Sequence, residues 1–313
     1  MYFKYMDQRL NTRNYSHLFA NSVPEEVWHS AADLIGRVAP TYEFAFFRMV
    51  FDDVVGLFHG EYPGYCPIKT PYHNLHHTLD VFLCAMRLIH GMRLSGVALS
   101  NREIALVMMA TLFHDVGYAQ LRDGKERGTG AQYTPTHVAR GLEFMRSYAA
   151  QHGIPADFVE ELVPVISCSD PRLPISTISF PNDRILLAGQ ILGTADLVGQ
   201  MADRNYLEKL SYLFQEFEEA HMGDFKSVHD MMRKTEGFYA KIQKKLDEDF
   251  GGLYHKFLPH FKDTLGKEKN LYMESIRKNM EYLAKITAMD ESEYLSRLRR
   301  GGIIRKIRAT RAG

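Results

Sequence analysis

Apolar residues along the chain recur at helical rather than strand spacing, and three stretches are apolar on almost every side. These stretches cover residues 76–92, 104–113 and 183–202. A helix that is apolar all round is normally buried in the interior of a protein. The three segments are therefore predicted to form the centre of the fold.

Other periodic stretches predict helices around this centre. They cover residues 24–38, 42–59, 206–220, 227–249, 269–288 and 291–300, with two more opening at Thr134 and Pro155. Three helix starts carry residues typical of caps: Ser22 with Glu25, Ser100 with Glu103, and Asn182. The sequence contains no alternating strand pattern, internal repeat or low-complexity tract, so the chain is predicted to be all-α.

Proline and glycine mark loops but no linker between two halves. Residues 60–71 hold three prolines and two glycines, and residues 169–181 hold three prolines. We expect one main domain over residues 1–265 and a C-terminal helical appendage over 266–313. The basic end of this appendage is interpreted as a solvated tail rather than a nucleic-acid contact.

Composition and charge narrow the class of protein. The chain has 313 residues, of which 45% are hydrophobic and 24% charged, enough for a substantial globular core. Lys plus Arg and Asp plus Glu both number 38, so no overall field attracts nucleic acid or a membrane. The apolar run 104–113 is shorter than the ~20 residues that cross a bilayer, and no signal peptide is evident. We expect a cytoplasmic protein without membrane or nucleic-acid partners, and a homodimer is left open.

Histidines and aspartates interrupt the three central apolar segments. His73, His76 and His77 precede the first, the pair His114-Asp115 ends the second, and Asp196 lies inside the third. A buried carboxylate is costly unless it is paired or bound to metal. Imidazole and carboxylate together suit Zn, Mn, Fe and similar ions. Each residue alone is ordinary, but the ordered set indicates a metal site.

This ordered set resembles the HD-domain metal-dependent phosphohydrolases, and most closely the class I cyclic-nucleotide phosphodiesterase catalytic domain. The resemblance is carried by Tyr72-His73-Asn74-x-x-His77-x-x-x-Val81, by His114-Asp115 and by Thr194-Ala195-Asp196-Leu197. It covers roughly residues 70–225. It implies a multi-helix bundle of the HD-domain type.

The resemblance also implies a catalytic apparatus. Two divalent metal ions (Zn, Mn, Mg or Fe) would be held by His77, His114, Asp115 and Asp196, with Asp115 bridging them as a catalytic residue. The nucleophile would be a hydroxide between the metals, and His73 would be the general acid that protonates the leaving oxygen. His137 is a further candidate for a metal ligand.

Several other residues are expected to support or line this site. Tyr72 and Asn74 would orient the metal ligands, and His76 would line the mouth of the site. Two positions depart from the family. Tyr118 stands where a further histidine is usual, and Met222 stands near the expected place of the glutamine that clamps a purine. Methionine cannot make those paired hydrogen bonds, which argues against base recognition.

The preferred hypothesis is a phosphohydrolase that cleaves a phosphodiester of a nucleotide, cyclic nucleotide or other small molecule. The first alternative is a nucleotidase or other phosphomonoesterase. The second is an HD-domain di-iron oxygenase, which the additional histidines keep open. The third is a non-catalytic binding module stabilised by metal, although such a module has no use for a general acid such as His73.

Overall fold

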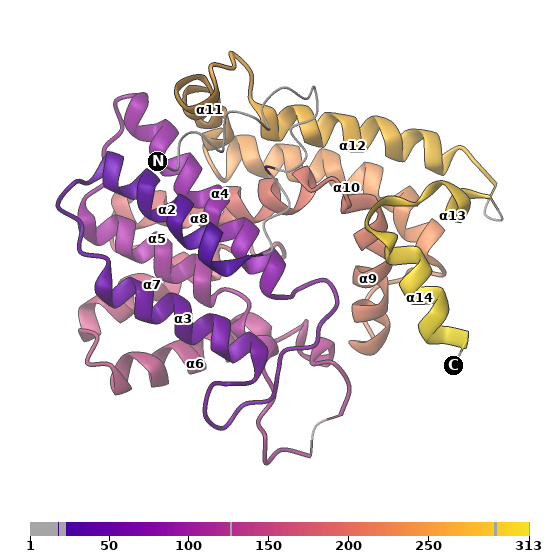
Figure 1. Cartoon of the computed structure of the whole chain (residues 1–313), viewed down its shortest axis with the longest axis horizontal. Helices are drawn as coiled ribbons and strands as arrows, with labels where there is room; N and C mark the ends of the chain where they lie inside the picture. Colours follow the sequence, from indigo (N-terminus) through magenta and orange to yellow (C-terminus); the bar gives the residue numbers. More distant parts are fainter. Residues whose placement is uncertain (1–17, 19–22, 126, 291–292, 313) are drawn as a thin grey trace.

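A computed structural model describes residues 18, 23–125, 127–290 and 293–312. Helices dominate these residues and no sheet occurs among them, so the predicted all-α class is confirmed. The isolated bridge between Tyr65 and Leu121 is the one strand-like pairing in the described part. Figure 1 shows α2 to α7 gathered on one side, with α9, α13 and α14 on the other.

The α-helices follow one another along the chain with short connections. They are α2 (Pro24–Val38), α3 (Ala45–His59), α4 (Leu75–Leu94), α5 (Asn101–Phe113), α6 (His137–Gln151), α7 (Ala156–Ser167), α8 (Asp183–Ala202), α9 (Tyr206–Glu219), α10 (Val228–Glu248), α11 (Phe257–Leu265), α12 (Leu271–Thr287), α13 (Tyr294–Arg297) and α14 (Ile303–Ala312). Short 3₁₀ turns are η2 (Val116–Tyr118), η3 (Ala131–Tyr133), η4 (Ile175–Thr177), η5 (Leu253–Lys256) and η6 (Arg300–Gly302).

The two longest apolar helices, α4 and α8, pack against each other at the centre. α4 is also covered by α2, α5 and α11, and α8 by α5, α7 and α12. Every side chain of α4 from His77 to Met92 is buried. This explains the unbroken apolar pattern, because no face of such a helix meets solvent.

The predicted helix caps that lie within the described residues are present in the structure. Ser100 and Glu103 form the predicted capping box, and the Asn182 side chain caps α8. Ser22 lies outside the described residues, and Val23 is the residue before α2, without a side-chain cap.

Three boundaries differ from those predicted. The helix expected over 42–59 begins at Ala45. The helix expected over 291–300, whose first two positions lie outside the described residues, is the single turn α13, and α14 follows Gly301 and Gly302, which adopt φ of 63° and 66°. α11 was not predicted, because Pro259 suggests a break although proline is tolerated in a first helical turn.

The C-terminal segment packs onto the helices that carry the site. The expected boundary after residue 265 coincides with the end of α11. Beyond it, the Asn279 side chain donates to the carbonyls of Met201 and Asp203, at 2.9 and 2.8 Å. Residues 271–287 thus form part of the same helical body.

One described helix, α8, is long and apolar enough to cross a membrane by length and composition alone. Of its most apolar window, 72% is buried inside the protein, as in the core helix of a globular fold.

Candidate metal centre

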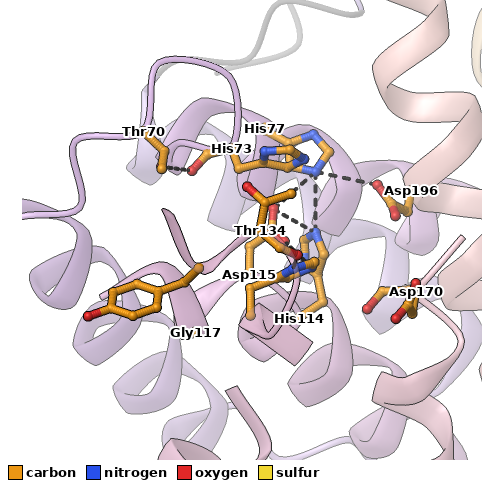
Figure 2. Close-up of polar contacts among 12 residues, drawn as sticks. Thr70, His73, His77, His114, Asp115, Gly117, Thr134, Asp170 and Asp196 are labelled. Atoms are coloured by element: carbon orange, nitrogen blue, oxygen red, sulfur yellow. Dashed lines mark hydrogen bonds and ion pairs between the residues drawn. The ribbon is translucent and has the colours of Figure 1, made fainter. Parts of the chain in front are cut away.

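The four strongest candidate ligands converge from three helices. His77 lies in the first turn of α4, His114 and Asp115 directly follow α5, and Asp196 lies in α8. The His77 Nε2 atom lies 3.3 Å from Asp115 Oδ2 and 3.4 Å from Asp196 Oδ1. His114 Nε2 lies 3.2 Å from the same Asp115 oxygen. Figure 2 shows these side chains meeting at one point.

Backbone carbonyls orient two of the imidazoles. His114 Nδ1 lies 2.8 Å from the carbonyl oxygen of Thr111, and His137 Nδ1 lies 2.8 Å from that of Thr134. A carbonyl only accepts, so each Nδ1 donates, and Nε2 faces the cluster. His114 Nε2 lies 3.3 Å from His77 Nε2, and His137 Nε2 lies 3.8 Å from Asp115 Oδ1. A second imidazole nitrogen held by a carbonyl is the usual support of a metal-binding histidine.

The donor set fits a divalent cation. His77, His114 and Asp115 are buried, and one ligand atom from each lies within 4.8 Å of the others, so this group could hold a metal ion. Asp115 Oδ2 is buried, and the two imidazole nitrogens of His77 and His114 are its neighbours at 3.3 and 3.2 Å. Two imidazoles and a carboxylate that converge on one point suit Zn²⁺, Mn²⁺ or Fe²⁺.

The carboxylates of the cluster favour positive charge on the neighbouring imidazoles. Burial opposes a charge on His77, but hydrogen bonds and charge from Asp115 and Asp196 outweigh it and raise its pKa from 6.5 to about 10. Burial likewise opposes ionisation of Asp115, and the surrounding histidines, His114 foremost, still hold its pKa well below 3.8. The cluster is therefore built for positive charge beside carboxylates.

Local backbone features place these ligands. The Asn74 side chain caps α4 by accepting a hydrogen bond from the His77 amide at 3.2 Å, so it fixes the turn that carries His77. Gly117 lies against the start of α6, and a Cβ there would meet the His137 carbonyl oxygen at 1.8 Å. Only glycine allows this close approach of η2 to the helix that bears His137.

His73 lies beside the cluster and is gripped by a carboxylate that the sequence did not single out. Glu216 Oε2 is 2.5 Å from His73 Nδ1, and Glu216 Oε1 accepts from the backbone amides of Tyr72 and His73 at 2.6 and 3.1 Å. Burial opposes a charge on His73, but Glu216 outweighs it and raises the pKa of the imidazole. The contact with Glu216 therefore favours the protonated form of His73.

Tyr118 packs against two of these histidines. Its ring stacks on His73 with centroids 5.0 Å apart and on His137 with centroids 4.7 Å apart. Its hydroxyl is buried without a hydrogen-bond partner in the described part of the chain. The His73 and His137 rings also lie against each other, with centroids 6.2 Å apart, so the three rings form one aromatic group beside the cluster.

His76 lies elsewhere than at the expected mouth. It does not contribute to the cavity beside the cluster, and its Nε2 lies 3.4 Å from Asp80 Oδ2. His76, Asp80 and Asp203 form a second group of ligand-type side chains. Lys209 pairs with Asp203 there and supplies a positive charge of its own.

A cavity of about 790 Å³ opens beside the cluster. His73, His77, Asp115, His137 and Asp196 contribute to its inner end, and the expected residues Tyr72, Tyr118 and Met222 also line it. Asp170 lines it too, and Figure 2 shows Asp170 on the same side of the cluster as Asp196. A small molecule entering this cavity would meet the cluster directly.

Asp170 was not singled out from the sequence. It follows α7 in a loop, where a carboxylate is usually solvated, yet it is buried and accepts hydrogen bonds from Arg172 at 2.7 and 2.9 Å. The ion pair with Arg172 balances the charge of Asp170. This pairing allows the carboxylate to lie buried in the wall of the cavity.

Comparison with known proteins gives one partial match. Residues 123–249 match the family model described as Npun_R2479-like. No curated protein and no solved structure matches the chain. The matched segment contains His137, Asp196 and Glu216 but not His73, His77, His114 or Asp115, so the chain is similar to that family over the α6–α10 half of the candidate centre.

Proposed function

We propose that the protein is a metal-dependent phosphohydrolase that cleaves a phosphodiester. The observation that carries the proposal is the pairing of two sites: a buried His/Asp cluster with converging imidazole nitrogens, and beside it a histidine bound to a buried carboxylate. His77 Nε2 and His114 Nε2 face each other at 3.3 Å next to Asp115, while Glu216 holds His73 at the same cavity. A structural metal site needs only the first of these.

Divalent cations bound by His77, His114, Asp115 and Asp196, with His137 as a further ligand, would neutralise the phosphate charge and acidify the attacking water. The protein's own residues supply the remaining steps. His73 donates its Nε2 proton to the leaving oxygen, while Glu216 keeps Nδ1 protonated and the ring in place.

The hydrolysis balances without any further reactant. The water oxygen forms a bond to phosphorus, and the ester P–O bond breaks with its electron pair going to the leaving oxygen. That oxygen takes the His73 proton and departs as an alcohol. The proton that the water loses can pass to a carboxylate oxygen of Asp196, which lines the cavity.

A second candidate rests on His137. Its Nε2 atom faces Asp115 and adds a third imidazole to the cluster, a donor set that also suits a pair of irons and oxygen-dependent oxidation. A phosphomonoesterase remains a third candidate, because the same cluster would bind a monoester. Metal content and substrate choice separate all three.

The test is elemental analysis of the purified full chain together with hydrolysis of bis(p-nitrophenyl) phosphate and p-nitrophenyl phosphate, with and without Mn²⁺. Two metals per chain and faster cleavage of the diester are expected. Two irons per chain with no hydrolysis would favour the di-iron oxygenase instead. Faster cleavage of the monoester than of the diester would favour a phosphomonoesterase. Absence of both bound metal and turnover would contradict every enzymatic assignment.

A further inference from the structure

We propose that the substrate is a phosphodiester whose non-leaving group is an extended apolar chain or aryl group rather than a nucleoside. This inference rests on the proposed phosphohydrolase activity and adds the chemical class of its substrate. It comes from the walls of the 790 Å³ cavity beyond the metal cluster. A cavity of this size accepts a ligand far larger than a phosphate.

The cavity offers no free carboxamide to read a base. Gln200 is the one carboxamide among the described residues that line it. Its Oε1 accepts from the Tyr72 hydroxyl at 2.8 Å, and its Nε2 lies 3.2 Å from both the carbonyl and the Oδ1 atom of Asp196. Both ends of Gln200 are therefore committed to the protein. A purine edge requires a side chain that can donate and accept at once.

The serine and threonine hydroxyls of the cavity wall are committed as well, whereas the Tyr118 hydroxyl has no hydrogen-bond partner among the described residues. Thr134 donates to the Ala131 carbonyl at 2.7 Å, and Ser169 donates to the Ile166 carbonyl at 2.8 Å. Thr235 donates to a carbonyl of its own helix in the same way. These groups close on the backbone instead of pointing hydrogens at a ligand.

The rest of the wall is apolar. Side chains from α8, α9 and α10 form most of it: Leu197, Leu210, Leu213, Phe217, Met231 and Phe238. Phe238 is 45% exposed although it faces this cavity. An apolar group that entered here would remove Phe238 and its neighbours from water, and this is the driving force for binding such a group.

The rim of the cavity adds positive charge. Lys234 is neutralised by Asp230 at 3.0 Å, and Arg172 by Asp170 at 2.7 Å. Arg233 and Lys241 also line the cavity and are exposed, and no ion pair is formed by either with the described residues. An anionic head group is therefore attracted toward a cavity whose interior favours apolar matter.

The test uses the full chain loaded with Mn²⁺ and a series of p-nitrophenyl phosphodiesters whose second group is methyl, butyl, octyl or 5′-thymidyl. The leaving group is constant, so differences in kcat/KM report the second group. We expect kcat/KM to rise about two- to fourfold per added methylene, and the octyl ester to exceed the thymidyl ester. Phe238→Ala should reduce the ratio of octyl to methyl turnover at least threefold. Leu258→Ala, which removes an apolar side chain that is 40% exposed on α11 and outside the cavity, should leave the ratio unchanged.

A binding measurement separates this inference from the proposed activity. Methylphosphonate and octylphosphonate are titrated into the same Mn²⁺-loaded protein by calorimetry, with tighter binding of the octyl compound expected. Cleavage of the diesters with no dependence on chain length, or a tenfold preference for thymidyl, would overturn the apolar substrate and leave the phosphohydrolase standing. No cleavage, with octylphosphonate binding at least tenfold tighter and weakened by Phe238→Ala, would support the apolar site and overturn the phosphohydrolase. Neither cleavage nor selective octyl binding would overturn both.

Discussion

Glu216 contacts His73 at two points and Tyr72 at a third: one carboxylate oxygen lies 2.5 Å from His73 Nδ1, and the other accepts from the backbone amides of His73 and Tyr72. The imidazole can neither turn nor easily lose its Nδ1 proton. Its other nitrogen is left to serve the cavity, which it lines. This pair gives the proposed general-acid role of His73 a physical basis that histidine alone would not have.

Replacing Glu216 tests this relationship. Glu216→Gln keeps the shape but removes the charge that raises the pKa of His73. A general acid must be protonated, so the alkaline limb of kcat/KM should move to lower pH. Turnover of esters with poor leaving groups should fall by about 10²-fold, within the range of general-acid catalysis.

The pH profile separates positioning from simple unfolding. Glu218→Gln lies on the same helix with an exposed side chain and should keep the wild-type profile. An unshifted alkaline limb in Glu216→Gln, at any turnover rate, would remove Glu216 from this role.

Substitution of the candidate metal ligands should weaken metal binding. His114→Ala and Asp115→Ala each remove a buried ligand atom. The affinity of each variant for Mn²⁺ should therefore fall by more than the ~10- to 100-fold that is typical when a residue that only supports a ligand is removed. The measurement is a Mn²⁺ titration followed by elemental analysis. His59→Ala, an exposed histidine on α3, is the matched control. Wild-type metal content in either cluster variant would mean that the ions bind elsewhere.

A buried histidine pair far from the cluster predicts sensitivity to acid. His260 Nδ1 lies 3.1 Å from His90 Nδ1. Burial, with Arg87 and His90 nearby, lowers the pKa of His260 from 6.5 to about 2. At pH values between about 2 and 6.5, His260 binds a proton in the unfolded chain but not in the folded protein. The free energy of unfolding therefore falls as the pH drops below 6.5. At pH 4.5 the loss is roughly 2–3 kcal/mol for this one group.

His260→Gln removes this titration and keeps a polar side chain opposite His90. Urea unfolding at pH 7 and pH 4.5 should show a smaller acid-induced loss in the variant than in the wild type. His59→Gln should behave like the wild type. An equal loss in His260→Gln and the wild type would show that His260 does not titrate between folded and unfolded states.

The close contact between η2 and α6 requires glycine at position 117. In Gly117→Ala the new Cβ would meet the His137 carbonyl at 1.8 Å, so η2 and α6 must separate. Overpacking of this kind costs about 1–3 kcal/mol. Gly36→Ala has open space at its Cβ inside α2 and should stabilise by roughly 0.5–1 kcal/mol. Thermal unfolding of the two variants should therefore shift in opposite directions, and equal shifts would contradict the close contact between η2 and α6.

The central helices and the cluster could be predicted because each carries a local mark. His77, His114 and Asp196 are polar residues set at the edge of, or within, otherwise apolar runs, and such interruptions need a partner. Their meeting in space confirms the grouping, while their chemistry stays a prediction.

Glu216 carries no such mark. α9 is amphipathic and holds further acidic side chains such as Glu208, Glu218 and Glu219, and the sequence does not say which of them faces inward. Only the packing of α9 against the rest of the fold selects Glu216. Asp170 could not be predicted for a similar reason. Aspartates in loops are usually solvated, and the burial of Asp170 depends on tertiary contacts.

The distance along the chain between His73 and Glu216 has a consequence for biosynthesis. The two residues are 143 positions apart, and Asp196 also comes long after His77. A nascent polypeptide that has left the ribosome only as far as α5 holds an open half-site with exposed imidazoles. In the proposed mechanism, the complete set of four ligands and the pairing of His73 with Glu216 can therefore form only after α8 and α9 have emerged.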